Sequence, residues 1–547
     1  MASTNWPELL YKFDTARIRT ATRLVFNGME GAGRLMGLFG MGKSKVCAVA
    51  AASTAEEMAK QIRAAVGETP TVELRLDWLR SDAERRRLLA WVKGQKLGSR
   101  VRLMATCRRV AAGGRFKNGI KGEMSWLAQA MEAGCEWCDL EVETLRELPG
   151  KTVRGFGLPP QVLLSAHDFK GTPALAREMK VADDSGVAAV KFAARANTIA
   201  DSLRLLGLAR TSKDFVAVPM GEIGLPARIL ALREGSALAY APVGEATAPG
   251  QVSLREMMHL YRAPELTRRT RVFGVIGDPV GHSLSPLLHN SGFVARNVDA
   301  VYLPFLVHRL KDFLDAVETL GIRGFSITLP HKETILKYLT ECDPLAAEIG
   351  AVNTVVVRGD GSLYGSNTDY VGVLRALEAK MRLRGSRMLV FGAGGAGRSA
   401  AFALARAGAH VAICARREQM GKSLARAVRG EFLRRPALRS EEFEGIINAT
   451  PVGMYPHPKI SPLSARELNC RIVMDLIYRP LDTELLKIAR KKGISTVSGV
   501  DMFLAQGFAQ WELWTGKSAP KAAMRRAVLQ LLRAGAAPGG KSRGSRT

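Results

Sequence analysis

The chain has 547 residues, of which 47% are hydrophobic and 24% are charged, a composition that is typical of globular proteins and excludes a disordered or fibrous one. A chain of this length is too long for one hydrophobic core and predicts about three or four compact units. No run of about 18 uncharged apolar residues occurs, so we expect no membrane-spanning helix.

The net charge of +28 has two interpretations, a nucleic-acid-binding surface or a basic enzyme that acts on anionic small molecules. The basic residues are scattered along helical segments such as 82–93 and are not gathered with aromatic residues. This pattern favours the enzyme, and we expect neither a nucleic-acid partner nor membrane association.

The two ends of the chain differ in composition from the rest. Residues 1–44 are rich in arginine and poor in acidic residues, as a targeting peptide is. An overextended gene start is an equal alternative, because Met41 directly precedes the first predicted strand. We expect a cytoplasmic protein, or an organellar one if residues 1–44 are a transit peptide. Residues 536–547 form a basic tail, rich in glycine and serine, that we expect to be disordered.

Seven cysteines are spread along the chain, an odd number that indicates a reducing compartment without a disulfide framework. Cys135 and Cys138 form a CxxC pair, but neither a second pair nor suitably spaced histidines accompany them. We therefore expect both cysteines to pack in the core and predict no metal site.

Residues 45–262 alternate short apolar runs with amphipathic helical patterns. Eight strands, each followed by a helix, predict a closed (β/α)8 barrel, in which the chemistry lies at the carboxyl ends of the strands. The predicted strands are 46–51, 71–78, 101–108, 137–143, 161–167, 188–193, 215–220 and 237–240. Side chains at or near their carboxyl ends are those of Glu73, Arg75, Arg108, His167, Lys191 and Met220.

Lys191 lies in the apolar strand Val190-Lys191-Phe192, and His167 ends the preceding strand. A lysine inside a barrel is costly to bury as a cation, which favours a neutral, nucleophilic amine that forms a Schiff base with a ketone. The alternatives are a snorkelling surface lysine and an ordinary core or loop histidine.

The runs Glu73-Leu-Arg-Leu-Asp77, Thr106-Cys-Arg-Arg109, His167-Asp-Phe169, Lys191 and Ala246-Thr-Ala-Pro-Gly-Gln251 resemble type I 3-dehydroquinate dehydratase over residues 45–262. The resemblance implies that Lys191 forms an imine with the substrate ketone and that His167 removes the C2 proton and helps the C1 hydroxyl leave. Arg228 would be the main carboxylate clamp. The implied substrate-binding residues are Glu73, Arg75, Arg108, Arg228, Thr247 and Gln251.

One position departs from that family. Where the family has a glutamate that by resemblance orients the catalytic histidine, this chain has Ala112, directly before Gly113 and Gly114. Loss of the orienting group could slow the dehydration, unless a neighbouring carboxylate takes its place.

A short polar linker, 263–271, leads to a second α/β unit at 272–370, a dinucleotide-binding unit at 385–506 and helices at 507–535 that we expect to pack on the second unit. The strand ending at Phe391 runs into Gly392, Gly394 and Gly397, the spacing that allows a tight turn, close approach of a pyrophosphate and close helix packing. The remaining cofactor-binding residues of this loop are Ala393, Gly395 and Ala396.

The next strand, 409–417, ends at Arg416 and Arg417, where an acidic ribose ligand would otherwise stand. Two guanidinium groups suit a 2′-phosphate, so the predicted cofactor is NADP rather than NAD.

Residues 272–535 resemble shikimate dehydrogenase through Gly277-Asp-Pro-Val-Gly-His-Ser283-Leu-Ser285-Pro286, Ser326-Ile-Thr328-Leu-Pro-His-Lys332, Asn353 and Asn367-Thr-Asp369. The resemblance implies that Lys332 and Asp369 form the acid-base pair, while Thr450 and Gly499 add cofactor contacts. The family's Asn-Arg-Thr motif is Ala415-Arg-Arg417 here, which puts the adenine contacts in doubt. The implied substrate-binding residues are Ser283, Ser285, Thr328, Asn353, Asp369, Tyr478 and Gln506.

Together the two resemblances imply a bifunctional enzyme that dehydrates 3-dehydroquinate and reduces 3-dehydroshikimate to shikimate with NADPH. One alternative is a quinate dehydrogenase with a residual barrel, although Ser283 and Ser285 together favour shikimate. Another is a basic nucleic-acid-binding protein with inactive enzyme folds, which would bind DNA in a salt-dependent way. The sequence does not predict an oligomeric state.

Overall fold

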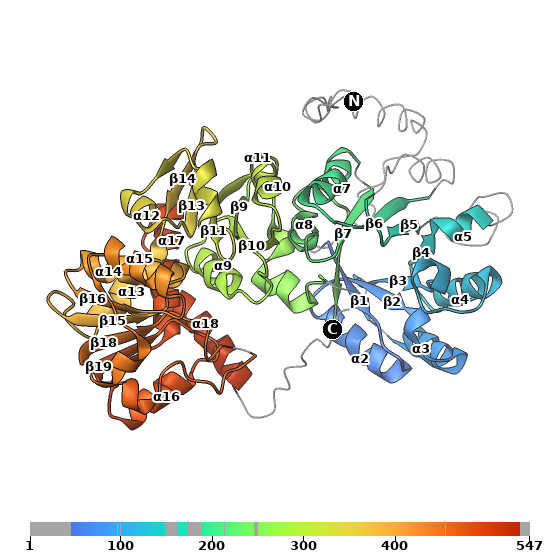
Figure 1. The fold of residues 1–547 in the computed structure, drawn as a ribbon. Coiled ribbons are helices and arrows are strands. Elements are labelled where there is room, and N and C mark those ends of the chain that lie inside the picture. The colour runs from blue at the N-terminus through green and yellow to red at the C-terminus, as the bar shows by residue number, and fades with distance from the viewer. Residues whose placement is uncertain are drawn as a thin grey trace, which may run out of the picture. The chain divides into compact units, whose positions relative to one another are not determined.

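A computed structural model describes residues 45–95, 97–98, 100–147, 161–172, 187–212, 214–244, 250–454 and 456–536 (Figure 1). Residues 1–44, Thr247 and the tail from 537 onward therefore lie outside the described residues. The chain divides into two compact units, Met1–Thr270 and Arg271–Thr547. Within the described residues, no helix is long and apolar enough to cross a membrane.

The first unit is a barrel of eight parallel strands in the order β8-β1-β2-β3-β4-β5-β6-β7. A hydrogen bond of 2.9 Å from the Ala237 amide to the Phe215 carbonyl links the β7 and β8 regions. The strands are β1 (Val46–Ala50), β2 (Thr71–Arg75), β3 (Arg102–Thr106), β4 (Trp137–Glu141), β5 (Val162–Asp168), β6 (Ala189–Arg195), β7 (Phe215–Met220) and β8 (Ala239–Pro242).

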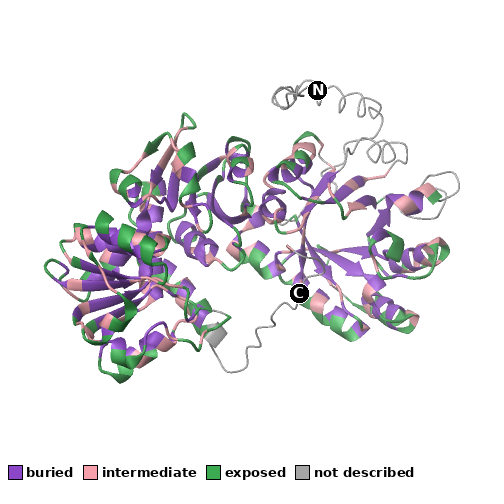
Figure 2. Ribbon diagram, in the orientation of Figure 1, coloured by how far each residue is buried: buried purple, intermediate pink, exposed green. Residues whose placement is uncertain are grey.

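Helices follow most of these strands and cover the outside of the barrel, so the strands are buried on both faces and read as apolar runs (Figure 2). The helix expected between β5 and β6 falls mainly on residues outside the described ones. The α-helices are α2 (Ala55–Val66), α3 (Asp82–Gly94), α4 (Ile120–Glu132), α5 (Val142–Glu147), α7 (Ile199–Thr211) and α8 (Leu225–Leu230). The shorter helices are η1 (Leu76–Trp78), η2 (Val110–Ala112), η5 (Glu256–Leu260) and η6 (Ala263–Glu265).

The barrel prediction is confirmed, but most of the expected strand boundaries shift by one to three residues, and three of these shifts have a clear local cause. The strand at 71–78 ends at Arg75, because the chain turns into η1, and Arg85 holds that turn by donating to the Leu76 and Leu79 carbonyls. The strand at 137–143 ends at Glu141, where α5 begins. The strand at 237–240 starts two residues later, since the Ser236 hydroxyl engages the Leu238 carbonyl.

The second unit begins with a mixed sheet in the order β10-β9-β11-β13-β14-β12. Its strands are β9 (Arg271–Gly277), β10 (Ala300–Leu306), β11 (Ile322–Ile327), β12 (Glu341–Cys342), β13 (Thr354–Val357) and β14 (Leu363–Ser366). Its helices are α9 (Ser285–Ala295), α10 (Leu310–Leu314), α11 (Val317–Leu320), η7 (Thr334–Tyr338), α12 (Pro344–Ile349) and α13 (Thr368–Glu378).

A second sheet follows, with all strands parallel, in the order β17-β16-β15-β18-β19-β20. This is the 3-2-1-4-5-6 order of doubly wound dinucleotide-binding folds, and it confirms the predicted fold class. The strands are β15 (Arg387–Phe391), β16 (His410–Cys414), β17 (Glu431–Phe432), β18 (Phe443–Asn448), β19 (Cys470–Asp475) and β20 (Ser495–Val497). The helices are α14 (Gly395–Arg406), α15 (Glu418–Ala427), η8 (Arg435–Arg439), η9 (Ala465–Glu467) and α16 (Glu484–Lys491).

The last helices, α17 (Gly499–Thr515) and α18 (Lys521–Ala536), return to the first sheet of this unit. Their buried side chains Trp511, Trp514 and Met524 share one hydrophobic cluster with Phe273 of β9 and Phe293 of α9.

Candidate active sites

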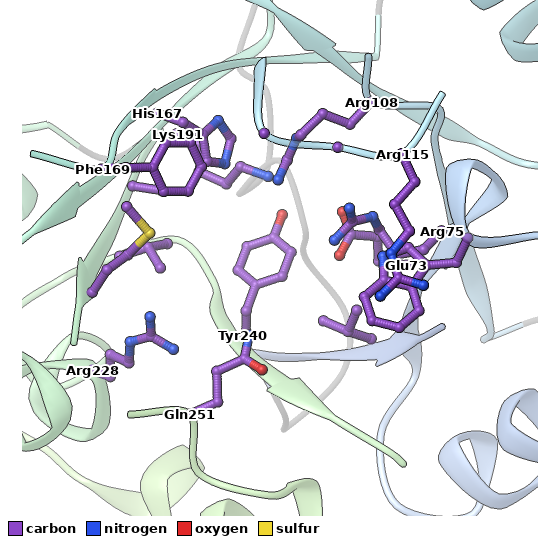
Figure 3. Close-up of a pocket in the computed structure, with 17 residues that line it drawn as sticks. Glu73, Arg75, Arg108, Arg115, His167, Phe169, Lys191, Arg228, Tyr240 and Gln251 are labelled. Carbon is purple, nitrogen blue, oxygen red and sulfur yellow. The ribbon is translucent and has the colours of Figure 1, made fainter. Parts of the chain in front are cut away.

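The barrel encloses a polar cavity of about 270 Å³ (Figure 3). Its walls include the carboxyl-terminal parts of several strands and the first turns after them, where barrel folds hold their chemistry. Thr247 lies outside the described residues. The sequence-predicted side chains that line the cavity are Glu73, Arg75, Arg108, His167, Lys191, Met220, Arg228 and Gln251.

Lys191 and His167 come from neighbouring strands and share the inner face of the barrel. Lys191 of β6 pairs in register with Ser165 of β5, and His167 lies two residues after Ser165. Because side chains alternate along a strand, both groups point to the same side, where Figure 3 shows them together. The snorkelling interpretation of Lys191 is wrong, since the residue is only 3% exposed.

The amine of Lys191 has a carboxylate partner that the sequence analysis missed. Its Nζ contacts Asp139 of β4 in a buried ion pair, and the same nitrogen lies 4.7 Å from the centre of the Tyr240 ring. Asp139 also accepts a hydrogen bond of 2.5 Å from the Ser165 hydroxyl. The amine is therefore not the isolated group that the sequence suggested, because a proton acceptor is in contact with it.

His167 has a carboxylate partner as well. Its Nδ1 lies 3.0 Å from Oε2 of Glu141, the last residue of β4. Burial and the charge of Arg108 lower the pKa of His167, and the charge of Glu141 opposes them. At neutral pH the imidazole is therefore a neutral base.

The sequence pattern around Asp139 and Glu141 could have predicted that both carboxylates face the interior of the barrel. They occupy alternate positions of an otherwise apolar strand, Trp137-Cys-Asp-Leu-Glu141, so both face the interior of the barrel. Charged residues are rarely buried without partners, so this pattern indicates a polar cluster inside the barrel.

Three buried arginines line the cavity, and they differ in their partners. Arg75 forms a two-pronged contact with Asp77 at 2.9 and 2.8 Å, and Arg108 donates to Glu141 at 2.6 Å. Arg228 contacts no carboxylate among the described residues and donates only to the Pro219 carbonyl. Burial lowers the pKa of Arg228 to about 10, as expected for a guanidinium that lacks a counter-ion.

The second unit brings three of its predicted site residues into one hydrogen-bonded cluster. Lys332 Nζ lies 2.6 Å from Oδ2 of Asp369, and the Asn353 amide donates to Oδ1 of Asp369 at 2.7 Å. The Asn353 carbonyl oxygen accepts from the Thr368 amide at 2.7 Å, which fixes the orientation of its side chain. The Thr368 hydroxyl contacts Gln506 of α17 at 3.5 Å.

The two predicted serines lie in a separate hydrogen-bonded chain. The Ser285 amide donates to the Ser283 hydroxyl at 3.2 Å. The hydroxyl of buried Tyr302 is hydrogen-bonded to Ser285 and Ser326, and Ser326 opens the segment that contains Thr328 and Lys332. Tyr302, which the sequence analysis missed, therefore ties the serine motif to the lysine motif.

Two other predicted residues lie in close-packed surroundings. Thr328 packs against Gly277, where an added Cβ would lie 2.3 Å from the threonine methyl. Tyr478 stacks on Phe503 of α17 with ring centres 5.0 Å apart, in the hydrophobic cluster of the C-terminal helices. Among the described residues, no hydrogen bond or ring contact joins Tyr478 to the Lys332 cluster.

The glycine-rich loop has the geometry that a pyrophosphate requires. Gly392 adopts a left-handed φ of 121°, and a Cβ on Gly397 would lie 2.3 Å from the Gly392 carbonyl oxygen. Helix α14 begins at Gly395, and no side chain caps its first amides. These amides are therefore available to an anion, and the loop fits a dinucleotide.

The remaining predicted cofactor residues follow β16 and β18 or begin α17 in the same unit. Arg416 and Arg417 are exposed directly after β16, and the Thr450 hydroxyl donates to Asn448 at 2.7 Å. Gly499 begins α17 at a point where a Cβ would lie 2.3 Å from the Ile477 carbonyl oxygen, so only glycine fits.

Comparison with known proteins agrees with both sites. The family model for type I 3-dehydroquinase matches residues 46–267. Models for the shikimate dehydrogenase substrate binding domain and the shikimate 5′-dehydrogenase C-terminal domain match residues 275–355 and 499–529. A bifunctional 3-dehydroquinate dehydratase/shikimate dehydrogenase of Arabidopsis thaliana, named chloroplastic, is 34% identical over 479 residues, covering 82% of this chain and 78% of that protein.

The chain belongs to the family of bifunctional 3-dehydroquinate dehydratase/shikimate dehydrogenases. The second unit is also 42% identical over 280 residues to an NADP(+) shikimate dehydrogenase of Methanosarcina acetivorans, covering 48% of this chain and 99% of that protein. A crystal structure of shikimate 5-dehydrogenase from Thermus thermophilus, with NADP(H) and shikimate, is 36% identical, covers 47% of this chain and 98% of its own, and has a TM-score of 0.45. Both resemblances found in the sequence are thus confirmed.

Proposed function

We propose that this bifunctional enzyme of the shikimate pathway converts 3-dehydroquinate to 3-dehydroshikimate in the barrel and reduces that product to shikimate with NADPH in the second unit. The observation that carries the proposal is the barrel cavity, which Lys191, His167 and Arg228 line together. A Schiff-base dehydration requires an amine, a neutral base and a cation that binds the substrate carboxylate, and these three side chains can supply them.

In the barrel, Lys191 gives a proton to Asp139 and its Nζ attacks the ketone carbon of the substrate. A C–N bond forms, the ketone oxygen leaves as water, and a protonated imine results. His167 then takes the C2 proton, and the electron pair moves into the imine to give an enamine. The electrons return to expel the C1 hydroxyl, which leaves as water with the proton from His167. Hydrolysis of the imine frees 3-dehydroshikimate and Lys191.

Arg228 binds the substrate carboxylate in this proposal. Arg75 and Arg108 already have carboxylate partners, whereas buried Arg228 contacts no carboxylate of the residues that the structure describes. A charge-assisted contact with an incoming carboxylate would supply the missing counter-ion. Glu73 and Gln251 also line the cavity and would bind substrate hydroxyls.

In the second unit, Lys332 and Asp369 act on the carbonyl of 3-dehydroshikimate. The cofactor is NADP, and when bound in its reduced form it supplies a hydride to the carbonyl carbon. Lys332 donates a proton to the carbonyl oxygen, so the reduction gives a hydroxyl. Asp369 holds the ammonium group in place and is itself held by Asn353. Ser283 and Ser285 bind the carboxylate, while Thr328, Tyr478 and Gln506 complete the substrate pocket.

Arg416 and Arg417 bind the 2′-phosphate of NADP. Both side chains are exposed at the end of β16, the position at which dinucleotide-binding folds meet the adenosine ribose. The loop 392–397 and Thr450 contact the rest of the cofactor.

The test is NADPH oxidation, assayed separately with each of the two substrates. We expect oxidation with 3-dehydroshikimate, and with 3-dehydroquinate after a lag in which the enone absorbance of the intermediate rises. If the protein reduces 3-dehydroshikimate but does not convert 3-dehydroquinate, the bifunctional assignment is wrong.

The cellular compartment stays a prediction, namely the cytoplasm, or an organelle if residues 1–44 act as a transit peptide. Imaging of residues 1–44 fused to a fluorescent protein in the source cells would separate these two locations.

A further inference from the structure

The absent glutamate at position 112 leaves His167 without the partner that the family resemblance implies. Ala112 ends the short helix η2 and is buried, and its methyl group accepts no hydrogen bond. Gly113 follows with a left-handed φ of 80°, so the backbone turns away at that point. The loop between β3 and α4 therefore supplies the backbone of this site but no carboxylate at position 112.

We infer that Glu141 is the positioning residue for His167 and supplies, from strand β4, the carboxylate that position 112 lacks. The inference rests on the proposed dehydratase function of the barrel. The Glu141 side chain is 1% exposed, and its Oε2 lies 3.0 Å from Nδ1 of His167.

The Glu141 carboxylate is held from two sides, so its orientation is fixed. Its Oε1 accepts a hydrogen bond of 2.6 Å from Nε of Arg108 and lies 3.0 Å from the Ser165 hydroxyl. With Oε1 engaged by Arg108, which follows β3, and by Ser165 of β5, Oε2 is directed to the histidine. A carboxylate restrained in this way can hold an imidazole ring in one orientation.

The same contact selects the tautomer of His167. Burial alone would raise the pKa of Glu141, but the charge of Arg108 and the hydrogen bond with His167 hold it well below its usual range. An ionised carboxylate only accepts hydrogen bonds, so Nδ1 must carry the hydrogen. Nε2 then keeps a free lone pair, which is the state a general base needs.

The decisive variant is Glu141→Gln in the full chain, because it keeps the size of the side chain and removes the charge. We expect kcat for dehydration to fall by about 10²-fold or more, with KM changed by less than about threefold, since the substrate contacts remain. Glu141→Asp keeps the carboxylate and should retain more activity than Glu141→Gln.

The pH dependence of kcat/KM distinguishes a positioning role of Glu141 from a merely structural one, which would leave that dependence unchanged. The charged groups around His167 are Arg108 from the segment after β3, Glu141 from β4 and Lys191 from β6. Glu141 raises the pKa of the histidine and the other two lower it. Removing the Glu141 charge should therefore move the acid limb of kcat/KM to lower pH.

Glu136→Gln is the matched control. Glu136 directly precedes β4 and forms a 2.8 Å ion pair with Arg102, but its side chain is 45% exposed. This variant removes one carboxylate from the same segment and should dehydrate 3-dehydroquinate like the wild type. Both variants should still reduce 3-dehydroshikimate at the wild-type rate.

A second measurement does not depend on activity. In protein labelled with ¹⁵N-histidine, the His167 signals of the wild type should be those of the Nδ1–H tautomer. In Glu141→Gln the amide can also donate to Nδ1, so the Nε2–H tautomer should become populated.

The outcomes separate the inference from the proposed function. If the wild-type protein does not dehydrate 3-dehydroquinate, the proposed function is overturned. An active wild type, combined with a Glu141→Gln variant that keeps its kcat, pH profile and tautomer, would overturn only the role of Glu141.

Discussion

Each of the two sites holds a lysine next to a carboxylate, but the two pairs differ in how deeply they are buried. In the barrel the Lys191 and Asp139 side chains are 4% and 0% exposed, and both residues come from strands of one sheet. In the second unit the Lys332 and Asp369 side chains are 20% and 10% exposed, and the pair joins a loop to the first turn of α13. A buried pair contributes to both folding and chemistry, whereas a partly exposed pair acts mainly in chemistry.

The largest effects should come from removing each lysine in turn. Lys191→Ala should abolish NADPH oxidation started from 3-dehydroquinate and leave that started from 3-dehydroshikimate nearly intact, because sites that share no residues or partners act independently. Lys332→Ala should stop NADPH oxidation from both substrates, yet 3-dehydroshikimate should still accumulate from 3-dehydroquinate. Enone absorbance and NADPH absorbance, recorded together, distinguish the two results. Loss of both activities in Lys191→Ala would contradict independence.

A covalent adduct with the substrate distinguishes the two lysines, since Lys191 should form one and Lys332 should not. Borohydride added with 3-dehydroquinate should reduce the imine and add substrate mass to the peptide that carries Lys191. Peptide mass spectrometry checks the position, with Lys191→Ala as the control. Labelling at Lys332, or no label in an active enzyme, would end the Schiff-base mechanism.

The carboxylates should differ in their effect on stability. Asp139→Asn leaves Lys191 buried without its counter-ion and should lower the free energy of unfolding of the first unit by about 3–5 kcal/mol. Asp369→Asn should cost the second unit less than about 2 kcal/mol, because its partner is partly exposed to water. Urea unfolding, followed by hydrogen exchange of peptides from each unit, measures both. Equal losses would show that burial is not what separates the two pairs.

Arg416 and Arg417 are exposed, in contrast to the buried arginines that line the barrel cavity. Replacing Arg416 and Arg417 together with glutamine removes two charge-assisted contacts, each worth about 1.5–3 kcal/mol. NADPH binding should therefore weaken far more than NADH binding, and calorimetry with both cofactors checks this. If both cofactors lose affinity equally, the arginines do not contact the 2′-phosphate.

The smallest effect concerns pH and a histidine outside either catalytic cluster. Burial lowers the pKa of His289 in α9 to about 3, so the folded protein keeps it neutral while the unfolded chain binds a proton below about pH 6.5. The second unit should lose about 2 kcal/mol of stability between pH 7 and pH 5 from this residue. His289→Phe should flatten that slope, whereas His410→Gln, at an exposed position of β16, should not change it.

The sequence predicted what depends on local pattern and spacing. The eight barrel strands, the glycine loop and the lysine and histidine of the barrel were all readable, since alternation and fixed spacing determine them. The strand ends at Arg75 and Glu141 were placed too late, because apolar residues such as Leu76 and Val142 continue the strand pattern into helical turns.

The partners of the catalytic groups were harder to predict, because they depend on pairing between strands. The sequence shows that position 112 lacks a carboxylate, but only the register of β4 and β5 brings Glu141 to His167. Tyr302 is a similar case, since its contacts with Ser285 and Ser326 join segments that are far apart in the chain.

The position of α17 and α18 has a consequence for the order in which the protein matures on the ribosome. The barrel strands lie between residues 46 and 242, so this unit can fold while the rest of the chain is still being made. The sheet of β9 to β14 instead needs Trp511, Trp514 and Met524 to cover Phe273 and Phe293. Its core stays incomplete until Met524 is translated, so a nascent chain that stalls before α17 should carry a finished barrel and a second unit that depends on chaperones.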